Sequence, residues 1–160
     1  MLSHESIVKL QGLCLTSNPM FALLEYAEIG TLESAISTSS PTSTQLCLTI
    51  ENYLMSIMIE IVRAVAHCHG MPTPVIHRDL KSDNVLLRDD LSCFVSDFGE
   101  AATLSKDGNS HLDGVGTPFY VSPENVLSEE IDEKSDIFSL AMLILELSSY
   151  YLQRIALEDG

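Results

Sequence analysis

The chain has 160 residues, 46% of them apolar, and its 23 acidic and 8 basic side chains give a net charge of −15. The apolar share is too high for a disordered acidic tail, and the length allows one domain or part of a larger one. Because so acidic a chain repels phosphate backbones, we expect no nucleic-acid partner.

The cysteines and the N-terminus favour a cytoplasmic protein. The four cysteines lie more than twenty residues apart without a C-x-x-C pair, which suits reduced thiols better than a disulfide framework. Residues 1–5 (MLSHE) lack the basic stretch and apolar run of a signal peptide. The longest apolar region, residues 137–147, is interrupted by Ser139 and Glu146. A membrane span needs about 20 residues, so we expect none.

The first 36 residues predict two strands and a short helix. Residues 7–15 and 20–26 are short apolar segments separated by the turn-rich sequence TSNP at 16–19. Gly30 then opens a short helix, with Thr31 as its cap. The residues expected to face inward are Leu32, Ala35 and Ile36.

A loop and a long amphipathic helix are predicted next. Residues 37–44 are seven Ser or Thr and one Pro, which is typical of an exposed loop. Apolar residues then recur at the three- and four-residue spacing of one helical face. These residues are Leu54, Ile57, Met58, Ile61, Val62 and Val65. The sequence GMPTP at 70–74 ends the helix.

The remaining chain alternates short elements with loops before a final helix. Residues 75–98 contain short apolar segments separated by turns, and a loop rich in Gly, Ser and Asp extends to about residue 116. Residues 133–147 are apolar on almost every side, which predicts a helix buried all round.

Three clusters carry the chemistry: HRDLKSDN at 77–84, DFG at 97–99 and GTPFYVSPE at 116–124. Singly, each has a structural explanation, since His77 could be a satisfied core histidine and Asp79 a turn former. In this order they resemble the H-R-D-L-x-x-x-N, D-F-G and A-P-E regions of eukaryotic protein kinases. The sequence is therefore identified as similar to the protein kinase family.

The resemblance implies an α+β, protein-kinase-like fold, of which this chain would be a part. Residues 1–24 would form the end of the sheet of the small N-terminal lobe, 25–30 the hinge, and 31–147 most of the mainly helical C-terminal lobe. Residues 148–160 would be a divergent tail. Residues 1–160 contain no glycine-rich phosphate loop and no V-A-I-K lysine, so we expect a domain that is incomplete at both ends.

The resemblance also implies roles for the catalytic loop. Asp79 would accept the proton of the substrate hydroxyl, and Lys81 would reach the transferring phosphate. Asn84 and Asp97 would hold Mg²⁺, which prefers such oxygen ligands. Arg78 would pair with a phosphorylated residue of the activation loop.

The expected nucleotide pocket begins at LEYA, residues 24–27, which resembles the kinase hinge. Leu24 would lie at the back of the adenine pocket. Backbone groups of Glu25 and Ala27 would hydrogen-bond the adenine edge, and Leu86 would form the pocket floor.

The function implied is that of a serine/threonine kinase, which transfers the γ-phosphate of ATP to a Ser or Thr hydroxyl of a protein substrate with Mg²⁺. Lys81 gives the H-R-D-L-K pattern typical of this class, and Thr117 would brace Asp79 and Lys81. Residues 4–10 and 143–147 resemble the tyrosine-kinase-like group. The alternative is a non-catalytic, kinase-derived binding or regulatory module, because the phosphate loop and strand lysine are not found in these residues.

One further motif, HCH at residues 67–69, suggests a metal site. Protein kinases often have an aromatic residue, an apolar residue and a histidine at this place, so we expect a structural role instead.

Overall fold

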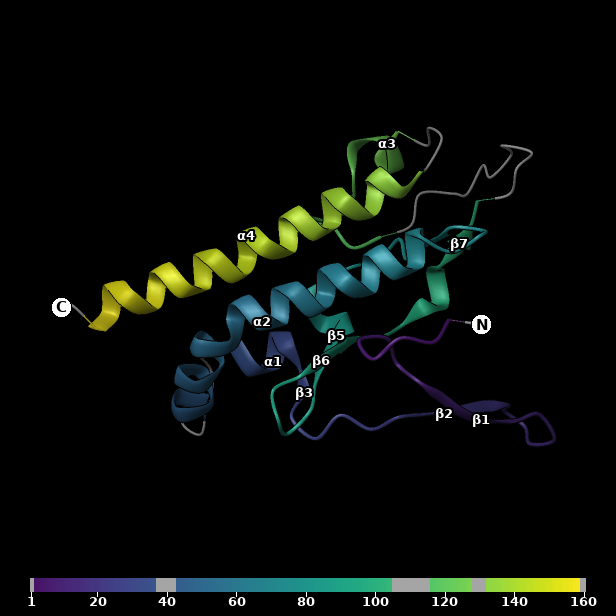
Figure 1. Cartoon of the computed structure of the whole chain (residues 1–160), viewed down its shortest axis with the longest axis horizontal. Coiled ribbons are helices and arrows are strands. Elements are labelled where there is room, and N and C mark those ends of the chain that lie inside the picture. Colours follow the sequence, from purple (N-terminus) through teal and green to yellow (C-terminus); the bar gives the residue numbers. More distant parts are fainter. Residues whose placement is uncertain (1, 37–42, 105–115, 128–131, 159–160) are drawn as a thin grey trace.

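The computed structural model describes residues 2–36, 43–104, 116–127 and 132–158. The fold is α+β: two long helices lie side by side and small sheets pack near them (Figure 1). The core forms where α2 (Ser43–His69) and α4 (Glu133–Glu158) meet the short strands and α1 (Leu32–Ile36).

An antiparallel hairpin begins the fold. Strands β1 (Leu10–Cys14) and β2 (Phe21–Leu24) confirm the two predicted strands within shorter bounds. The hairpin projects from the rest of the molecule and its side chains are mostly exposed (Figure 1). The segment before it is attached to the core, because the backbone N–H of Val8 donates to Val95 (2.9 Å) and that of Val95 donates to Ser6 (3.0 Å).

The predicted short helix is present as α1, and it follows a two-residue strand, β3 (Gly30–Thr31), that the sequence analysis did not predict. Gly30 has φ of 98°, a left-handed conformation that favours glycine. Thr31 Oγ1 accepts the Ser34 backbone N–H at 3.1 Å, which confirms the cap. The three predicted inward residues are buried. Of the predicted loop, residues 37–42 lie outside the described part, and Ser43 and Thr44 already belong to α2.

The long helix α2 ends at His69, just before Gly70. Its predicted inward face is confirmed by Leu54, Ile57, Ile61 and Val65, and half-buried Met58 lies at the edge. Val62 is an error in the prediction, since its side chain is 43% exposed. Each residue turns about 100° around the helix axis, so Val62 lies beyond the edge of the buried stripe.

Short strands position the loops between the two long helices. Strands β5 (Val85–Leu87) and β6 (Cys93–Val95) pair antiparallel and extend β3 into a three-stranded sheet. Strand β4 (Val75–Ile76) pairs with β7 (Ala102–Thr103). Two single turns of 3₁₀ helix overlap the first two motifs: η1 (Ser82–Asn84) ends the motif at 77–84, and η2 (Phe98–Glu100) begins within DFG.

The expectation that the last helix is buried all round is wrong. After α3 (Pro123–Val126), helix α4 buries one face only, through Leu140, Leu143 and Leu147. Leu145, on the opposite face, is 58% exposed. The helix also continues without a break beyond the predicted end at residue 147, so the predicted tail is helical up to Glu158. A face of a helix is buried only where another segment packs on it, and the described residues cover one face of α4.

By length and composition alone, residues 133–152 of α4 could cross a membrane, with a mean hydropathy of 1.2. The sequence analysis did not predict a helix of this length and hydropathy, because it considered only the apolar region 137–147, which ends at Leu147. The helix packs against α2, and its polar side chains Asp136, Ser139 and Glu146 bind other segments of the fold. These contacts tie one face of the helix to the rest of the fold, and 33% of the apolar window is buried.

Candidate active site

The catalytic-loop motif is anchored by Asp136, at the start of α4. This side chain is 1% exposed, and its carboxylate accepts the backbone N–H groups of His77 (2.8 Å) and Arg78 (2.9 Å). The Nε2 atom of His69 lies 2.8 Å from the same carboxylate. Three partners satisfy a carboxylate that would otherwise be costly to bury, and they hold the loop against α4.

His77 connects this loop to the segment before Asp97. Its Nε2 lies 2.9 Å from the carbonyl oxygen of Ser96, and its Nδ1 accepts the Asp79 backbone N–H at 3.3 Å. The ring also packs on Phe98, with 4.7 Å between ring centroids. Burial lowers the pKa of His77, so the ring is neutral and carries its proton on Nε2.

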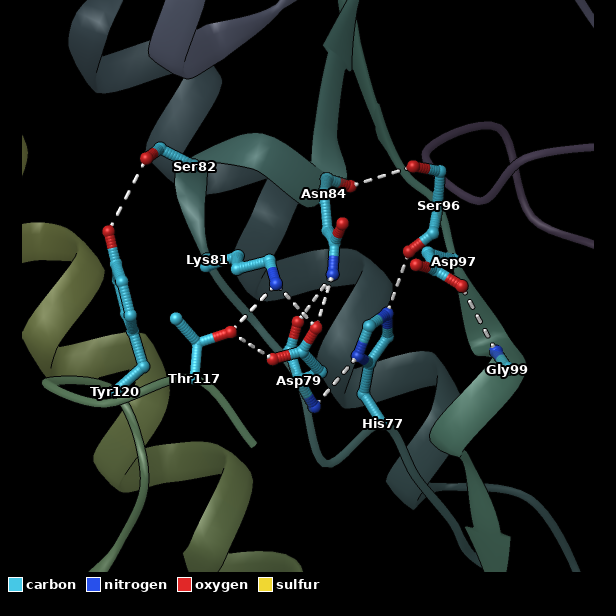
Figure 2. A network of polar contacts seen from close by, with 10 residues as sticks. All are labelled: His77, Asp79, Lys81, Ser82, Asn84, Ser96, Asp97, Gly99, Thr117 and Tyr120. Atoms are coloured by element: carbon cyan, nitrogen blue, oxygen red, sulfur yellow. Dashed lines mark hydrogen bonds and ion pairs between the residues drawn. The ribbon is translucent and has the colours of Figure 1, made fainter. Parts of the chain in front are cut away.

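Asp79 is the centre of the polar network in Figure 2. Its Oδ1 accepts the Thr117 hydroxyl at 2.7 Å, and its Oδ2 lies 2.7 Å from Lys81 Nζ and 3.0 Å from Asn84 Nδ2. Lys81 Nζ also donates to Thr117 Oγ1 at 2.7 Å, which closes a triangle. Partial burial alone would raise the pKa of Asp79, but the hydrogen bonds from Lys81, Thr117 and Asn84 outweigh it and lower the pKa.

Asn84 and Asp97 come from neighbouring segments joined by Ser96, whose backbone N–H (2.8 Å) and hydroxyl (3.1 Å) both donate to the Asn84 carbonyl. The Nδ2 group of Asn84 donates to Asp79, which leaves the amide oxygen as the remaining acceptor end. Asp97 has φ of 59° and an exposed side chain, whose Oδ1 accepts the Gly99 backbone N–H at 3.3 Å (Figure 2).

This pair of oxygen donors fits Mg²⁺, which is usually held by one or two protein carboxylates or carbonyls together with substrate phosphates. In residues 2–36, 43–104, 116–127 and 132–158, no three or more His, Cys, Asp or Glu side chains group as a metal site.

A cavity of about 480 Å³ joins the hinge end of β2 to the DFG segment. Leu24 lies on one wall and Asp97, Phe98 and Gly99 lie on another. Leu86 is half-buried on β5 and does not line this cavity. The structure thus brings Leu24, but not Leu86, to the cavity that Asp97 borders.

The hinge-like segment is held through Glu25. Its backbone N–H donates to the carbonyl of Lys9 (3.0 Å), and its side chain accepts the Lys9 N–H (2.9 Å). The same carboxylate lies 3.3 Å from Arg88 Nη2. Ala27 follows as a half-buried residue.

Arg78 is 6% exposed and has φ of 72°, and its Nη1 donates to the carbonyl of Glu100 at 3.3 Å. Its guanidinium therefore contacts the start of the activation segment, which is the chain between the DFG motif at 97–99 and the SPE sequence at 122–124. Residues 105–115 lie outside the described part, so the pairing of Arg78 with a phosphorylated residue there stays a prediction.

Comparison with known proteins decides the family. The family described as "Protein kinase domain" matches residues 1–153. The chain belongs to the protein kinase family. A probable leucine-rich repeat receptor-like protein kinase from Arabidopsis thaliana is 33% identical over 151 residues. The probable serine/threonine-protein kinase roco5 from Dictyostelium discoideum is 36% identical over 151 residues. Serine/threonine-protein kinase shk2 from Schizosaccharomyces pombe is 34% identical over 145 residues.

These alignments cover 91%, 91% and 90% of this chain but only 13%, 5% and 23% of the three relatives. The kinase domain segment therefore spans a small part of the length of the proteins it resembles. The resemblance deduced from the three motifs is confirmed by the family match.

The sequence analysis assigned no role to three residues at this site, although Ser82 and Tyr120 lie inside the first and third motifs. Ser82, Tyr120 and Glu146 form a further set of hydrogen bonds beside the Asp79 network. One signal was present in the sequence, since Glu146 and Ser139 interrupt the long apolar segment of α4. Their partners are distant in sequence, so only the fold reveals what they contact.

The HCH sequence has the expected structural role. His67 packs against the ring of His4 (5.0 Å between centroids), Cys68 is buried in the core, and His69 contacts Asp136. The three side chains therefore serve three separate contacts.

Proposed function

We propose that this segment carries the catalytic loop of an ATP-dependent serine/threonine protein kinase. The observation that carries the proposal is the network around Asp79, in which a cation, a hydroxyl and an amide hold one carboxylate in its ionised form. Such a carboxylate, in a chain of the protein kinase family, is suited to orient a hydroxyl nucleophile.

In the proposed step, Asp79 accepts the proton of a substrate Ser or Thr as its oxygen bonds to the γ-phosphorus of ATP. The bond from that phosphorus to the oxygen bridging the β- and γ-phosphates breaks, and ADP leaves with the bonding electron pair. An ionised carboxylate has about four acceptor positions, of which Thr117, Lys81 and Asn84 occupy three. One position remains for the substrate. Because its pKa is lowered, Asp79 is a weak base and contributes mainly by positioning.

Bound ATP with Mg²⁺ supplies the phosphoryl group and neutralises the charge of the phosphates. We assign Asn84, through its amide oxygen, and the exposed carboxylate of Asp97 as the metal ligands. Lys81, already directed at Thr117 and Asp79, would place its charge beside the transferring phosphoryl group.

The nucleotide base would lie at the hinge. Leu24, which lines the cavity beside Asp97, would form the back of the adenine pocket. Leu86 is proposed as its floor although it lies on β5 outside that cavity. Since the Glu25 N–H is engaged by Lys9, we assign the Glu25 carbonyl and the backbone of Ala27 to the adenine edge. This assignment also sets the proposed lobe boundary, with residues 1–24 in the small lobe and 31–147 in the large one.

The serine/threonine preference is proposed from Lys81, and two of the relatives, roco5 and shk2, are named as serine/threonine-protein kinases. Arg78 is proposed to receive a phosphorylated activation-loop residue. The contact of its guanidinium with the Glu100 carbonyl, at the start of that segment, supports this role.

The test is phosphate transfer by the intact protein that carries residues 1–160, with Ser, Thr and Tyr peptides as acceptors. Asp79→Asn is expected to lower kcat by about 10²- to 10⁴-fold, the usual contribution of a positioned proton acceptor. Asp83→Asn is the matched control, because Asp83 lies in the same loop with an exposed side chain. Equal activity of Asp79→Asn and wild type would refute the assignment, and transfer to Tyr alone would refute the substrate class. No transfer by a folded wild-type protein would favour the non-catalytic module instead.

A further inference from the structure

The guanidinium of Arg88, which directly follows β5, contacts several separate segments of the chain. Its Nη2 lies 3.3 Å from Glu25 Oε2 and donates to the carbonyl of Glu5 at 3.2 Å. Its Nη1 donates to the Ser92 hydroxyl at 3.1 Å, and its central carbon lies 4.5 Å from the ring centroid of Phe94. We call Arg88, Glu5, Glu25, Ser92 and Phe94 the Arg88 cluster.

The Arg88 cluster spans the proposed boundary between the two lobes. Glu5 belongs to the segment proposed for the small lobe, and Glu25 begins the proposed hinge. Arg88, Ser92 and Phe94 lie in β5, β6 and the turn between them, within the proposed large lobe. One guanidinium therefore joins all three parts where the hinge begins.

The ion pair in this cluster is partly withdrawn from water. The side chains of Arg88 and Glu25 are 24% and 13% exposed. Phe94 is fully buried, so one face of the cation rests on an apolar ring. Salt screens such a pair less than an exposed one, and removal of either partner leaves the other charge uncompensated.

The contacts of Glu25 attach it to two parts of the fold. Its backbone N–H donates to the Lys9 carbonyl at 3.0 Å and its Oε1 accepts the Lys9 N–H at 2.9 Å, while its Oε2 faces Arg88. Lys9 directly precedes β1, and the hairpin that β1 begins projects from the rest of the molecule (Figure 1). Arg88 is thus the contact that ties the Glu25 side chain to the large lobe.

Both ends of the hinge are attached at one place, the end of β5. The backbone N–H of Ile29 donates to the Leu87 carbonyl at 3.2 Å, and Glu25 pairs with the next residue, Arg88. Between these two attachments lies Ala27, whose backbone is assigned to the adenine edge. A segment fixed at both ends presents its backbone groups in one arrangement, so less conformational freedom is lost when a nucleotide base binds.

We propose that Arg88 is a positioning residue for the nucleotide. It holds Glu25, and with it the backbone of the hinge, in the arrangement that receives the adenine of ATP. Arg88 acts through Glu25 and does not touch the base. The proposal rests on the proposed kinase function and deepens it, because it names a residue that sets the affinity for ATP.

The test is Arg88→Ala in the intact protein that carries residues 1–160. The KM for ATP is expected to rise about tenfold while kcat changes by less than about twofold, since hinge contacts hold the base equally in the ground state and the transition state. The loss of a charge-assisted hydrogen bond is enough for a factor of this size. A variant that only loses folded protein would lower kcat and leave KM unchanged, so the rise in KM separates positioning from stability.

Two companion variants sharpen the test. Arg88→Lys keeps the charge but not the planar fork, so it is expected to restore part of the affinity. Glu25→Gln keeps an acceptor for the Lys9 N–H and removes the charge, so it should raise KM as Arg88→Ala does, and it provides the same test if Arg88→Ala does not fold. The double variant should be no worse than Arg88→Ala alone, because both changes break one pair.

Arg63→Ala is the matched control, because Arg63 is an exposed arginine on α2. It is expected to leave the KM for ATP unchanged. An equal rise in KM in Arg63→Ala, or an unchanged KM in both Arg88→Ala and Glu25→Gln, would refute the role of Arg88 while leaving the kinase function intact.

Binding of ADP, measured by calorimetry, does not depend on catalysis. About tenfold weaker binding of ADP by Arg88→Ala, with Arg63→Ala like wild type, supports the role of Arg88 even if the wild-type protein transfers no phosphate. That combination would refute the proposed catalytic activity alone. A folded wild-type protein that binds neither ATP nor ADP would refute both proposals.

Discussion

The clearest test of how this fold is held together is Asp136→Ala. The Asp136 side chain is 1% exposed, and its carboxylate accepts two backbone N–H groups and lies 2.8 Å from His69 Nε2. Alanine removes all three contacts and provides no acceptor in their place. The N–H groups of His77 and Arg78 then remain buried without partners.

The expected loss follows from those two N–H groups. An unsatisfied buried donor costs about 1–3 kcal/mol, so two of them cost about 2–6 kcal/mol, and the lost His69 contact adds to this. A typical domain is stable by about 5–15 kcal/mol, so this single substitution removes a large share of the total. Asp136→Asn should be nearly as harmful, because its amide offers one acceptor oxygen and presents N–H groups to the second donor.

The free energy of unfolding can be measured by urea denaturation followed by circular dichroism, and hydrogen exchange at residues 77–78 reports the local effect. Asp132→Ala is the control, since Asp132 also binds a nearby backbone N–H (Lys134, 2.8 Å) but is an exposed contact. We expect the control to lose less than about 1 kcal/mol. A loss below about 1 kcal/mol in Asp136→Ala, with slow exchange at 77–78 preserved, would refute the anchoring role.

Three further predictions concern pH, packing and association. Burial lowers the pKa of His77 below its ordinary 6.5, so this side chain binds a proton more tightly in the unfolded chain than in the folded one. The contribution of His77 to the free energy of unfolding should be complete above pH 6.5 and should fall by up to about 1.4 kcal/mol per pH unit below it. His77→Phe should flatten this dependence when denaturation is measured at several pH values. An unchanged slope in that variant would contradict the argument. Ser122 is fully buried, and its hydroxyl has no partner in the described residues. Ser122→Ala should therefore raise the free energy of unfolding by about 1 kcal/mol. A loss of stability in the same assay would show that the hydroxyl makes a contact after all. A polypeptide of residues 1–160 alone should self-associate through apolar side chains such as Ile137 and Leu145, 51% and 58% exposed, and a monodisperse monomer in light scattering would count against this.

Local pattern was a reliable guide where a segment's structure depends on its own residues. Thr31 as a cap, the start of α1 and the end of α2 before Gly70 follow from side-chain hydrogen bonding and backbone preference within a few positions. Burial was less predictable. Val62 and the outer face of α4 are apolar yet exposed, because an apolar residue is buried only where another segment covers it.

The acidic composition argued against a nucleic-acid partner, and the length allowed part of a larger domain. Both were informative only about the class of protein. The order of the three motifs then determined the protein kinase family from sequence alone, since these residue types at this spacing are uncommon by chance. What only the tertiary structure decided is how these residues are held. The contacts of Asp136 with His77 and of Glu146 with Ser82 join positions 59 and 64 residues apart, and no local pattern encodes which distant donor meets which carboxylate.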